Sequence, residues 1–225
     1  MLKYPCLVLD HDDTVVQTER AVGYPYFRDY IEKIRPGMTL SFPEYVKDCN
    51  NMIFADMCRK RWQFTDKEMR EEYEGWKAYS RIHIPPIFAG IDRIIKRQKE
   101  EGGLICVASL STSEMIQRDY LHHFGFLPDA IYDNDLPFEK RKPAIYPLED
   151  IMNRFSLSSK DILVLDDMKL GWSMAEPLHI HAAYAAWSKK DFPELANQME
   201  EIFTYTFDST EKLYNFLFCD LTAVI

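Results

Sequence analysis

The segment Cys6-Leu7-Val8-Leu9-Asp10-His11-Asp12-Asp13-Thr14 decides how this sequence is interpreted. Its first four residues form an apolar run of the kind that makes a buried parallel strand. Three carboxylates follow closely, and such groups repel one another and are costly to remove from water. A hard divalent cation with oxygen ligands would neutralise them, and open α/β sheets bind ligands beyond the carboxyl ends of their strands. The segment therefore predicts an acidic metal site, although an acidic turn or helix cap accounts for these residues alone equally well.

The composition is that of a folded protein that binds neither nucleic acid nor a membrane. The chain has 225 residues, of which 47% are hydrophobic, enough for one large core with an inserted lid. The net charge of -9 argues against a nucleic-acid partner but does not exclude an anionic small-molecule substrate. No apolar run is long enough for a membrane span or a signal peptide. Five scattered cysteines without metal-binding spacing favour a cytoplasmic setting.

The hydrophobic pattern divides the chain into a helical stretch and an alternating one. Residues 17–85 contain no convincing strand, and Ser41-x-x-Glu44 and Thr65-x-x-Glu68 form capping boxes that start helices. After Gly90, helices alternate with strand candidates, which implies right-handed crossovers and a parallel sheet. The strands are expected at residues 104–108, 130–132, 162–165, 180–187 and 204–207.

The apolar residues of the helical stretch are interpreted mainly as packing. Met69, Tyr73 and Trp76 fall on one helical face, which favours helix packing over a substrate pocket. An aromatic cluster earlier in the stretch either packs or lines a pocket, with packing favoured. It consists of Tyr24, Tyr26, Phe27 and Tyr30.

Reactive side chains follow several of the predicted strands at the point where each strand ends. Asp10 and Asp12 follow the first strand, Ser109 follows residues 104–108, and Asp166-Asp167 follow the strand at 162–165. Lys142 closes a Lys-Arg-Lys cluster that precedes another helix. Because the carboxyl ends of parallel strands meet at one edge, we expect these groups to converge there. Together they are the parts needed to transfer a phosphoryl group through an aspartyl-phosphate.

These residues, in this order, resemble the motifs of the haloacid dehalogenase superfamily of phosphohydrolases. The pattern D-x-D-x-T matches residues 10–14, and Ser109, Lys142-Pro143 and Asp166-Asp167 match the three later motifs. The helical stretch and the hinge-like segment 86–90 resemble the subgroup related to phosphoglycolate phosphatase and beta-phosphoglucomutase. The resemblance covers essentially the whole chain. It implies an α/β fold in which a Rossmann-like three-layer core with a parallel sheet, residues 1–16 and 86–225, carries an all-helical cap domain, residues 17–85.

The resemblance also implies a role for each matched residue. Asp10 would be the nucleophile, and Asp12 would protonate the leaving oxygen and then activate water. Ser109 would hydrogen-bond a phosphoryl oxygen, and Lys142 would offset the charge on Asp10 and the phosphoryl group.

The same resemblance implies a Mg²⁺ site. The ion would lie between the Asp10 carboxylate, the Asp12 backbone carbonyl and the acid pair. Within that pair, Asp167 is favoured as the direct ligand, and Asp166 would support it or share the ion.

The sequence departs from the family pattern at four positions. Asp13 replaces a glycine, although aspartate tolerates positive φ comparatively well, and replacing it with Gly is expected to retain the fold and to leave metal affinity equal or greater. Leu110 replaces a polar residue, and Ile145 replaces a second proline. Gly171 stands where a second metal-supporting Asp is common, and the neighbouring Asp166 is expected to compensate.

The leading hypothesis is a Mg²⁺-dependent phosphohydrolase that acts on a small phosphorylated metabolite through an aspartyl-phosphate. Two alternatives stay open: a sugar-phosphate mutase that uses the same site, and a catalytically weak binding protein that retains the fold. A receiver-type signalling module is disfavoured, because receivers are shorter and carry their acid pair on the first strand. The sequence does not specify the substrate or the oligomeric state.

Overall fold

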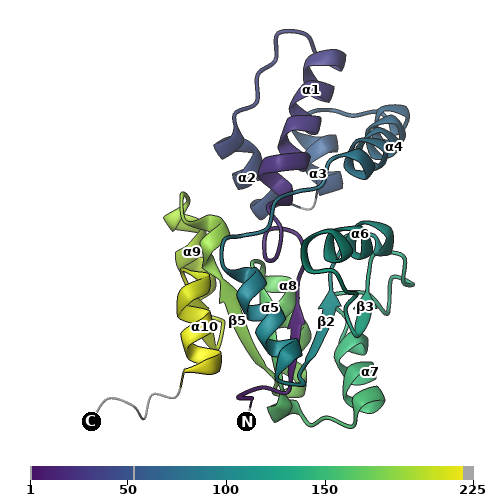
Figure 1. Cartoon of the computed structure of the whole chain (residues 1–225). Helices are drawn as coiled ribbons and strands as arrows, with labels where there is room; N and C mark the ends of the chain where they lie inside the picture. The colour runs from purple at the N-terminus through teal and green to yellow at the C-terminus, as the bar shows by residue number, and fades with distance from the viewer. Residues whose placement is uncertain (1, 53, 220–225) are drawn as a thin grey trace. The chain divides into compact units, whose positions relative to one another are not determined.

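The computed structural model describes residues 2–52 and 54–219 and divides into two compact units (Figure 1). The first, here called the core unit, comprises Met1–Val16 and Ile87–Ile225. The second, the helical unit, comprises Gln17–Pro86.

The core unit is built on a parallel sheet, as the alternating pattern predicts. In the described part of the chain the sheet has six strands in the order β3-β2-β1-β4-β5-β6, and every pair is parallel. The strands are β1 (Cys6–Leu9), β2 (Leu104–Ala108), β3 (Ala130–Tyr132), β4 (Ile162–Asp166), β5 (His181–Ala185) and β6 (Tyr205–Phe207). This order places β1, which carries the acidic segment, in the middle of the sheet.

Helices cover both faces of this sheet and give the three-layer α/β core that was expected. Helices α5 (Ile91–Glu100), α6 (Ser113–Phe124) and α10 (Thr210–Phe218) pack on one face. Helices α7 (Tyr146–Phe155), α8 (Lys169–Ala175) and α9 (Pro193–Glu200) pack on the other.

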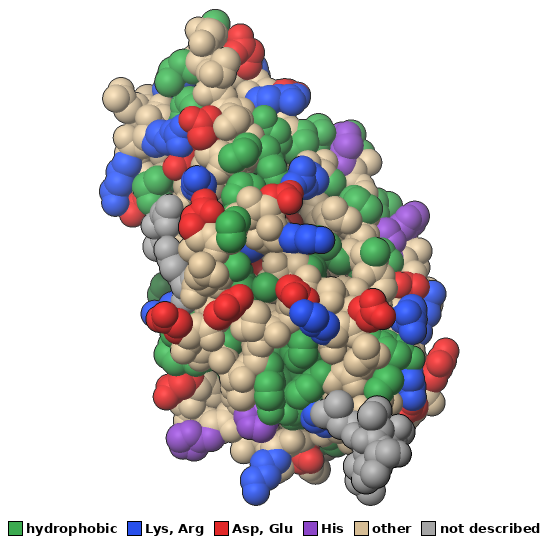
Figure 2. Space-filling view, turned by 90° about the vertical axis from the view of Figure 1, so that its left-hand side faces the viewer, with side chains coloured by type: hydrophobic (Ala, Val, Ile, Leu, Met, Phe, Trp, Pro, Cys, Tyr) green, Lys and Arg blue, Asp and Glu red, His purple; other side chains and the backbone are tan. Residues whose placement is uncertain are grey.

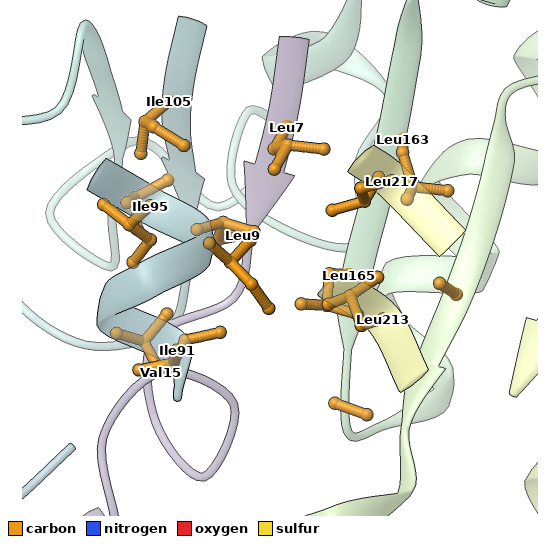
Figure 3. Close-up of a cluster of buried hydrophobic side chains, with 14 of the residues drawn as sticks. Leu7, Leu9, Val15, Ile91, Ile95, Ile105, Leu163, Leu165, Leu213 and Leu217 are labelled. Carbon is orange, nitrogen blue, oxygen red and sulfur yellow. The ribbon is translucent and has the colours of Figure 1, made fainter. Parts of the chain in front are cut away.

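Side chains alternate across the central strand, and this alternation builds two separate cores. Leu7 and Leu9 point into the first core, whereas Cys6 and Val8 point into the second. Figure 3 shows the first core, where leucines and isoleucines of the sheet face those of α5 and α10. Because all four β1 side chains are fully buried, the strand is held rigidly on both faces.

Two predicted boundaries in the core unit are corrected. The pattern Ser111-x-x-Glu114 predicts a helix start at Ser111, but helix α6 begins after Thr112. Ser111 is held in the preceding turn, because its backbone N–H donates to Ser109 Oγ. The strand predicted at residues 180–187 stops at Ala185, where its partners β4 and β6 end. The chain continues as a 3₁₀ turn, η4 (Ala186–Lys189).

The helical unit contains only helices and connecting loops among its described residues. After the π-helical turn η1 (Glu19–Gly23) come α1 (Tyr24–Ile34), α2 (Phe42–Asn51), α3 (Phe54–Lys60) and α4 (Asp66–Ile82). Both predicted capping boxes are present, at Ser41 before α2 and at Thr65 before α4.

The aromatic cluster of α1 packs within the helical unit, as favoured from the sequence. Phe27 is buried among other aromatic rings, including Trp62 and Phe64. Three tyrosine hydroxyls donate to backbone carbonyls of the same unit: Tyr24 to Leu40, Tyr26 to Glu72 and Tyr30 to Glu68.

The face of α4 that is expected to pack, with Met69, Tyr73 and Trp76, is only partly buried. Tyr73 is 43% exposed, and Met69 and Trp76 are only partly buried. The helix instead buries Glu72 and Ser80, because Gly75 lets α1 approach: a Cβ at Gly75 would overlap the Tyr26 hydroxyl. The close approach of α1 to α4 decides which face of α4 is buried, and the hydrophobic pattern of the sequence does not predict that approach.

The buried Glu72 carboxyl gives the first testable prediction. Burial raises its pKa to about 7. Between pH 4.5 and pH 7 the folded chain therefore holds a proton that the unfolded chain has lost, so rising pH favours unfolding. Through Glu72 alone, the free energy of unfolding should fall by about 3 kcal/mol across this range and then level off. Glu72→Gln should remove this loss and be more stable than the parent at pH 8.

Denaturant melts at several pH values measure the effect, with the exposed neighbour Glu71→Gln as the control. A parent and a Glu72→Gln variant with parallel stability profiles from pH 4.5 to 8 would contradict the prediction.

The surface carries charges of both signs. On the face shown in Figure 2, acidic and basic side chains are interspersed. In the described residues, no helix has both the length and the apolar character that crossing a membrane requires.

Candidate active site

The acidic segment leaves the sheet through a tight turn at the carboxyl end of β1. The Asp10 backbone N–H donates to Leu165 O at 2.8 Å, so the Asp10 backbone is still fixed to β4. The chain then folds back, with Asp13 N–H donating to Val16 O at 2.7 Å. Asp13 adopts φ of +55°, in the left-handed region, so aspartate does take the conformation expected for the glycine of the family pattern.

Lys142 reaches this turn from the loop that precedes α7. Its buried ammonium donates to Asp10 Oδ1 at 2.8 Å and also pairs with Asp166 Oδ2. Its neighbour Lys140 is exposed, and Arg141 bonds to Asn134. The structure thus brings Lys142, of the three basic residues, to Asp10.

The acid pair lies at the same edge. Asp10, Asp166 and Asp167 each place a carboxylate oxygen within 4.8 Å of the others, and all three residues are buried. Burial raises the pKa of Asp166 to about 8, against the opposing attraction of Lys142. Burial also disfavours the charged Lys142, but Asp10 and Asp166 outweigh it and raise the pKa of its ammonium.

Ser109 follows β2, the strand beside β1. The register pairs Leu9 with Val107, so Asp10 and Ser109 emerge next to each other at the same sheet edge. Ser109 is fully buried, and its Oγ accepts from Ser111 N–H at 3.2 Å. The adjacent Leu110 is 44% exposed.

Lys189 is a site residue that the sequence reasoning missed. It lies in η4, directly after β5, and is 6% exposed. Its ammonium is 2.7 Å from Asp167 Oδ2 and 3.4 Å from Asp13 Oδ2. The signal was available, because Lys189-Lys190 follows a predicted strand whose carboxyl end opens on the reactive edge.

A second polar contact fixes the turn to α6. His11 Nε2 lies 3.0 Å from Asp119 Oδ2, on α6, and both residues are buried. Burial disfavours the imidazolium, but Asp119 and the carboxylate of Asp12 outweigh it and raise the pKa of His11. Trp187 Nε1, in η4, also donates to Thr14 O at 3.2 Å, so η4 supports the same turn.

Gly171 has a geometric explanation. A Cβ at this position of α8 would overlap the Oδ2 and Cβ atoms of Asp166. The Asp166 side chain fills the space that any side chain at position 171 would occupy. The sequence already suggests that Asp166 compensates for the acid missing at position 171, and the structure adds that the two side chains would compete for the same space.

The carboxylate cluster fits a divalent metal ion. Three buried carboxylates each bring a hard oxygen donor within 4.8 Å of the other two, so one ion between them could contact all three. The Asp12 side chain is not among those three donors and is partly exposed.

A family model agrees with this arrangement. The model described as haloacid dehalogenase-like hydrolase matches residues 7–185, most of the chain. The protein therefore belongs to the haloacid dehalogenase-like hydrolase family. No curated protein matches this sequence.

Solved structures with low sequence identity share the fold over nearly the whole chain. A mutant of CbbY from Rhodobacter sphaeroides, in complex with xylulose-(1,5)bisphosphate, is 15% identical with a TM-score of 0.69, and covers 95% of this chain and 96% of its own. A predicted phosphoglycolate phosphatase from Haemophilus somnus is 16% identical with a TM-score of 0.74, covering 96% and 99%. A subfamily IA hydrolase of the superfamily from Geobacter sulfurreducens is 11% identical with a TM-score of 0.67, covering 96% and 97%.

Proposed function

We propose that this protein is a Mg²⁺-dependent phosphohydrolase that cleaves a small phosphorylated metabolite through an aspartyl-phosphate. One observation carries the proposal: the buried Lys142 ammonium links Asp10 to Asp166, beside Asp167, at the carboxyl edge of the sheet. A carboxylate held beside a fixed ammonium and two further acids is equipped to receive a phosphoryl group and to bind its counterion.

In the proposed mechanism Asp10 and Asp12 divide the chemistry. An Asp10 carboxylate oxygen attacks phosphorus, and the bond from phosphorus to the substrate oxygen breaks. Asp12 donates its proton to that departing oxygen, which leaves as an alcohol. Asp12, now a carboxylate, takes a proton from water as the water oxygen attacks the phosphorus of the aspartyl-phosphate. The Asp10 carboxylate is released together with inorganic phosphate, and Asp12 is protonated for the next cycle.

Other groups would bind the phosphoryl oxygens and neutralise the negative charge of the reaction. Ser109 would donate its hydroxyl hydrogen to a phosphoryl oxygen, and Lys142 would offset negative charge on Asp10 and on the transferred group. Mg²⁺, held by Asp10, Asp167, Asp166 and the Asp12 backbone carbonyl, would supply charge neutralisation at the phosphoryl oxygens. Because Asp10 and Lys142 are buried, little water competes for their contacts with the substrate.

The substrate class rests on the family and on two of the structures that share the fold. CbbY is solved with xylulose-(1,5)bisphosphate, and the Haemophilus protein is described as a predicted phosphoglycolate phosphatase. By analogy we propose that residues 17–85 act as a cap domain that selects the metabolite, while residues 1–16 and 86–225 carry the reaction. The proposed setting is cytoplasmic, and no disulfide joins the cysteines of the described residues.

Removal of the metal tests the cofactor. Excess chelator is expected to lower the hydrolysis of p-nitrophenyl phosphate at least about 100-fold, because the phosphoryl charge is then unneutralised. Added Mg²⁺ should restore the rate. Circular dichroism in chelator provides the control that the chain is still folded. Full activity in excess chelator, with no response to added Mg²⁺, would rule out the proposed metal role of the acid pair.

A further inference from the structure

Lys189 and Asp13 bring two extra charges to the candidate site. Lys189 contacts Asp167 and Asp13 through one buried ammonium, at 2.7 Å and 3.4 Å. Asp13 stands where the family pattern has glycine, and it has the left-handed backbone of that position. Lys189 lies outside the four motifs that this chain shares with the family, and the proposed mechanism uses neither residue.

The charges of the two residues cancel. The buried acids Asp10, Asp13, Asp166 and Asp167 carry four negative charges when ionised, and Lys142 and Lys189 carry two positive ones. With all six groups ionised, the formal charge of this cluster is -2, which one divalent cation would neutralise. Removing Asp13 and Lys189 together leaves the same balance, whereas removing either one alone shifts it by a full charge.

The shorter of the two Lys189 contacts is to the acid favoured as the direct metal ligand. Lys189 bonds to Oδ2 of Asp167, which leaves Oδ1 of that carboxylate for a cation. A positive charge so close to a metal-binding carboxylate weakens cation binding, because buried charges are poorly screened. Asp13 Oδ2 contacts the same ammonium at 3.4 Å, and its negative charge offsets this effect.

Resting on the proposed function, we propose that Lys189 is a positioning residue that sets the affinity of the site for Mg²⁺ through Asp167, and that Asp13 is its compensating partner. Each residue alone changes the Mg²⁺ affinity of the site, and together their effects cancel. This reverses the effect expected from the sequence for loss of Asp13: with Lys189 present, removal of the Asp13 carboxylate weakens Mg²⁺ binding.

A double-mutant cycle read by Mg²⁺ binding tests the pair. Isothermal titration calorimetry would compare the parent with Lys189→Met, Asp13→Asn and the double variant. Asn retains the shape of Asp13 and tolerates its left-handed backbone. We expect Lys189→Met to bind Mg²⁺ at least about ten-fold more tightly, Asp13→Asn about ten-fold more weakly, and the double variant within about three-fold of the parent.

The exposed neighbour Lys190→Met removes the same charge from the same loop and should leave Mg²⁺ affinity unchanged. Thermal melts provide a second readout. Lys189→Met should melt at a lower temperature than the parent in chelator, because Asp13 and Asp167 lose their counterion. It should gain more stability than the parent from saturating Mg²⁺.

The outcomes separate this inference from the proposed function. If the parent binds Mg²⁺ and Lys189→Met binds it with the same affinity, the inference is overturned and the phosphohydrolase proposal stands. If the parent binds no Mg²⁺, the metal role and the inference both fail. If Lys189→Met does not fold, Asp13→Asn decides the question: weaker binding supports the inference, and equal or tighter binding overturns it.

Discussion

Asp10→Asn is expected to lower kcat for p-nitrophenyl phosphate at least about 1000-fold, a loss of about 4 kcal/mol of transition-state stabilisation. The amide has nearly the shape of the carboxylate but lacks the negative oxygen that attacks phosphorus. The fold should persist, because Lys142 keeps its pairing with Asp166. Steady-state kinetics with Mg²⁺ measure the loss, and near- and far-ultraviolet circular dichroism confirms the fold.

The exposed Asp135→Asn on the loop before α7 is the matched control and should retain parental kcat. If Asp10→Asn hydrolyses the substrate as fast as the parent, Asp10 is not the nucleophile. The proposal would then lose its first step.

Lys142→Met is expected to lower both the stability of the protein and its activity. The substitution keeps the length of the side chain but leaves Asp10 and Asp166 buried without their ammonium. Breaking a buried pair by removing one partner costs about 3–5 kcal/mol of stability. We therefore expect the free energy of unfolding in chelator, measured by denaturant melts, to fall by this amount. In Mg²⁺ we expect kcat to be at least about 100-fold lower.

Lys140→Met, on the exposed side of the same basic cluster, should change neither quantity. A Lys142→Met variant with parental stability in chelator would show that its ammonium does not compensate these acids. Parental kcat would remove it from the mechanism.

The parts of the fold that the sequence predicts are those determined by local pattern. The strands expected at residues 104–108 and 130–132 coincide with β2 and β3, since short apolar runs with polar neighbours leave few alternatives. Helices α2 and α4 start where their capping boxes place them. Asp10, Ser109, Lys142 and the acid pair all follow or approach strand ends, so their common edge follows from the parallel topology.

The parts that the sequence does not predict depend on partners far along the chain. The length of β5 is set by its neighbours β4 and β6, and its early end places Lys189 in a turn beside Asp167. The buried face of α4 is set by the approach of Tyr26 at Gly75, not by the apolar stripe that includes Tyr73. In each case a tertiary contact overrides a local pattern.

The central claim is that Asp10 carries the phosphoryl group, and peptide mass spectrometry of an acid-quenched reaction tests it most directly. The Asp12→Asn variant is the protein to use with p-nitrophenyl phosphate. The aryl leaving group of this substrate departs with little need for a proton, so the first step can proceed without Asp12. Hydrolysis of the aspartyl-phosphate still needs the Asp12 carboxylate as a base, so the intermediate should accumulate. The account predicts that the added mass of one phosphoryl group accumulates on Asp10. Release of p-nitrophenol by Asp12→Asn with no adduct, or with the adduct on another residue such as Ser109, would contradict it.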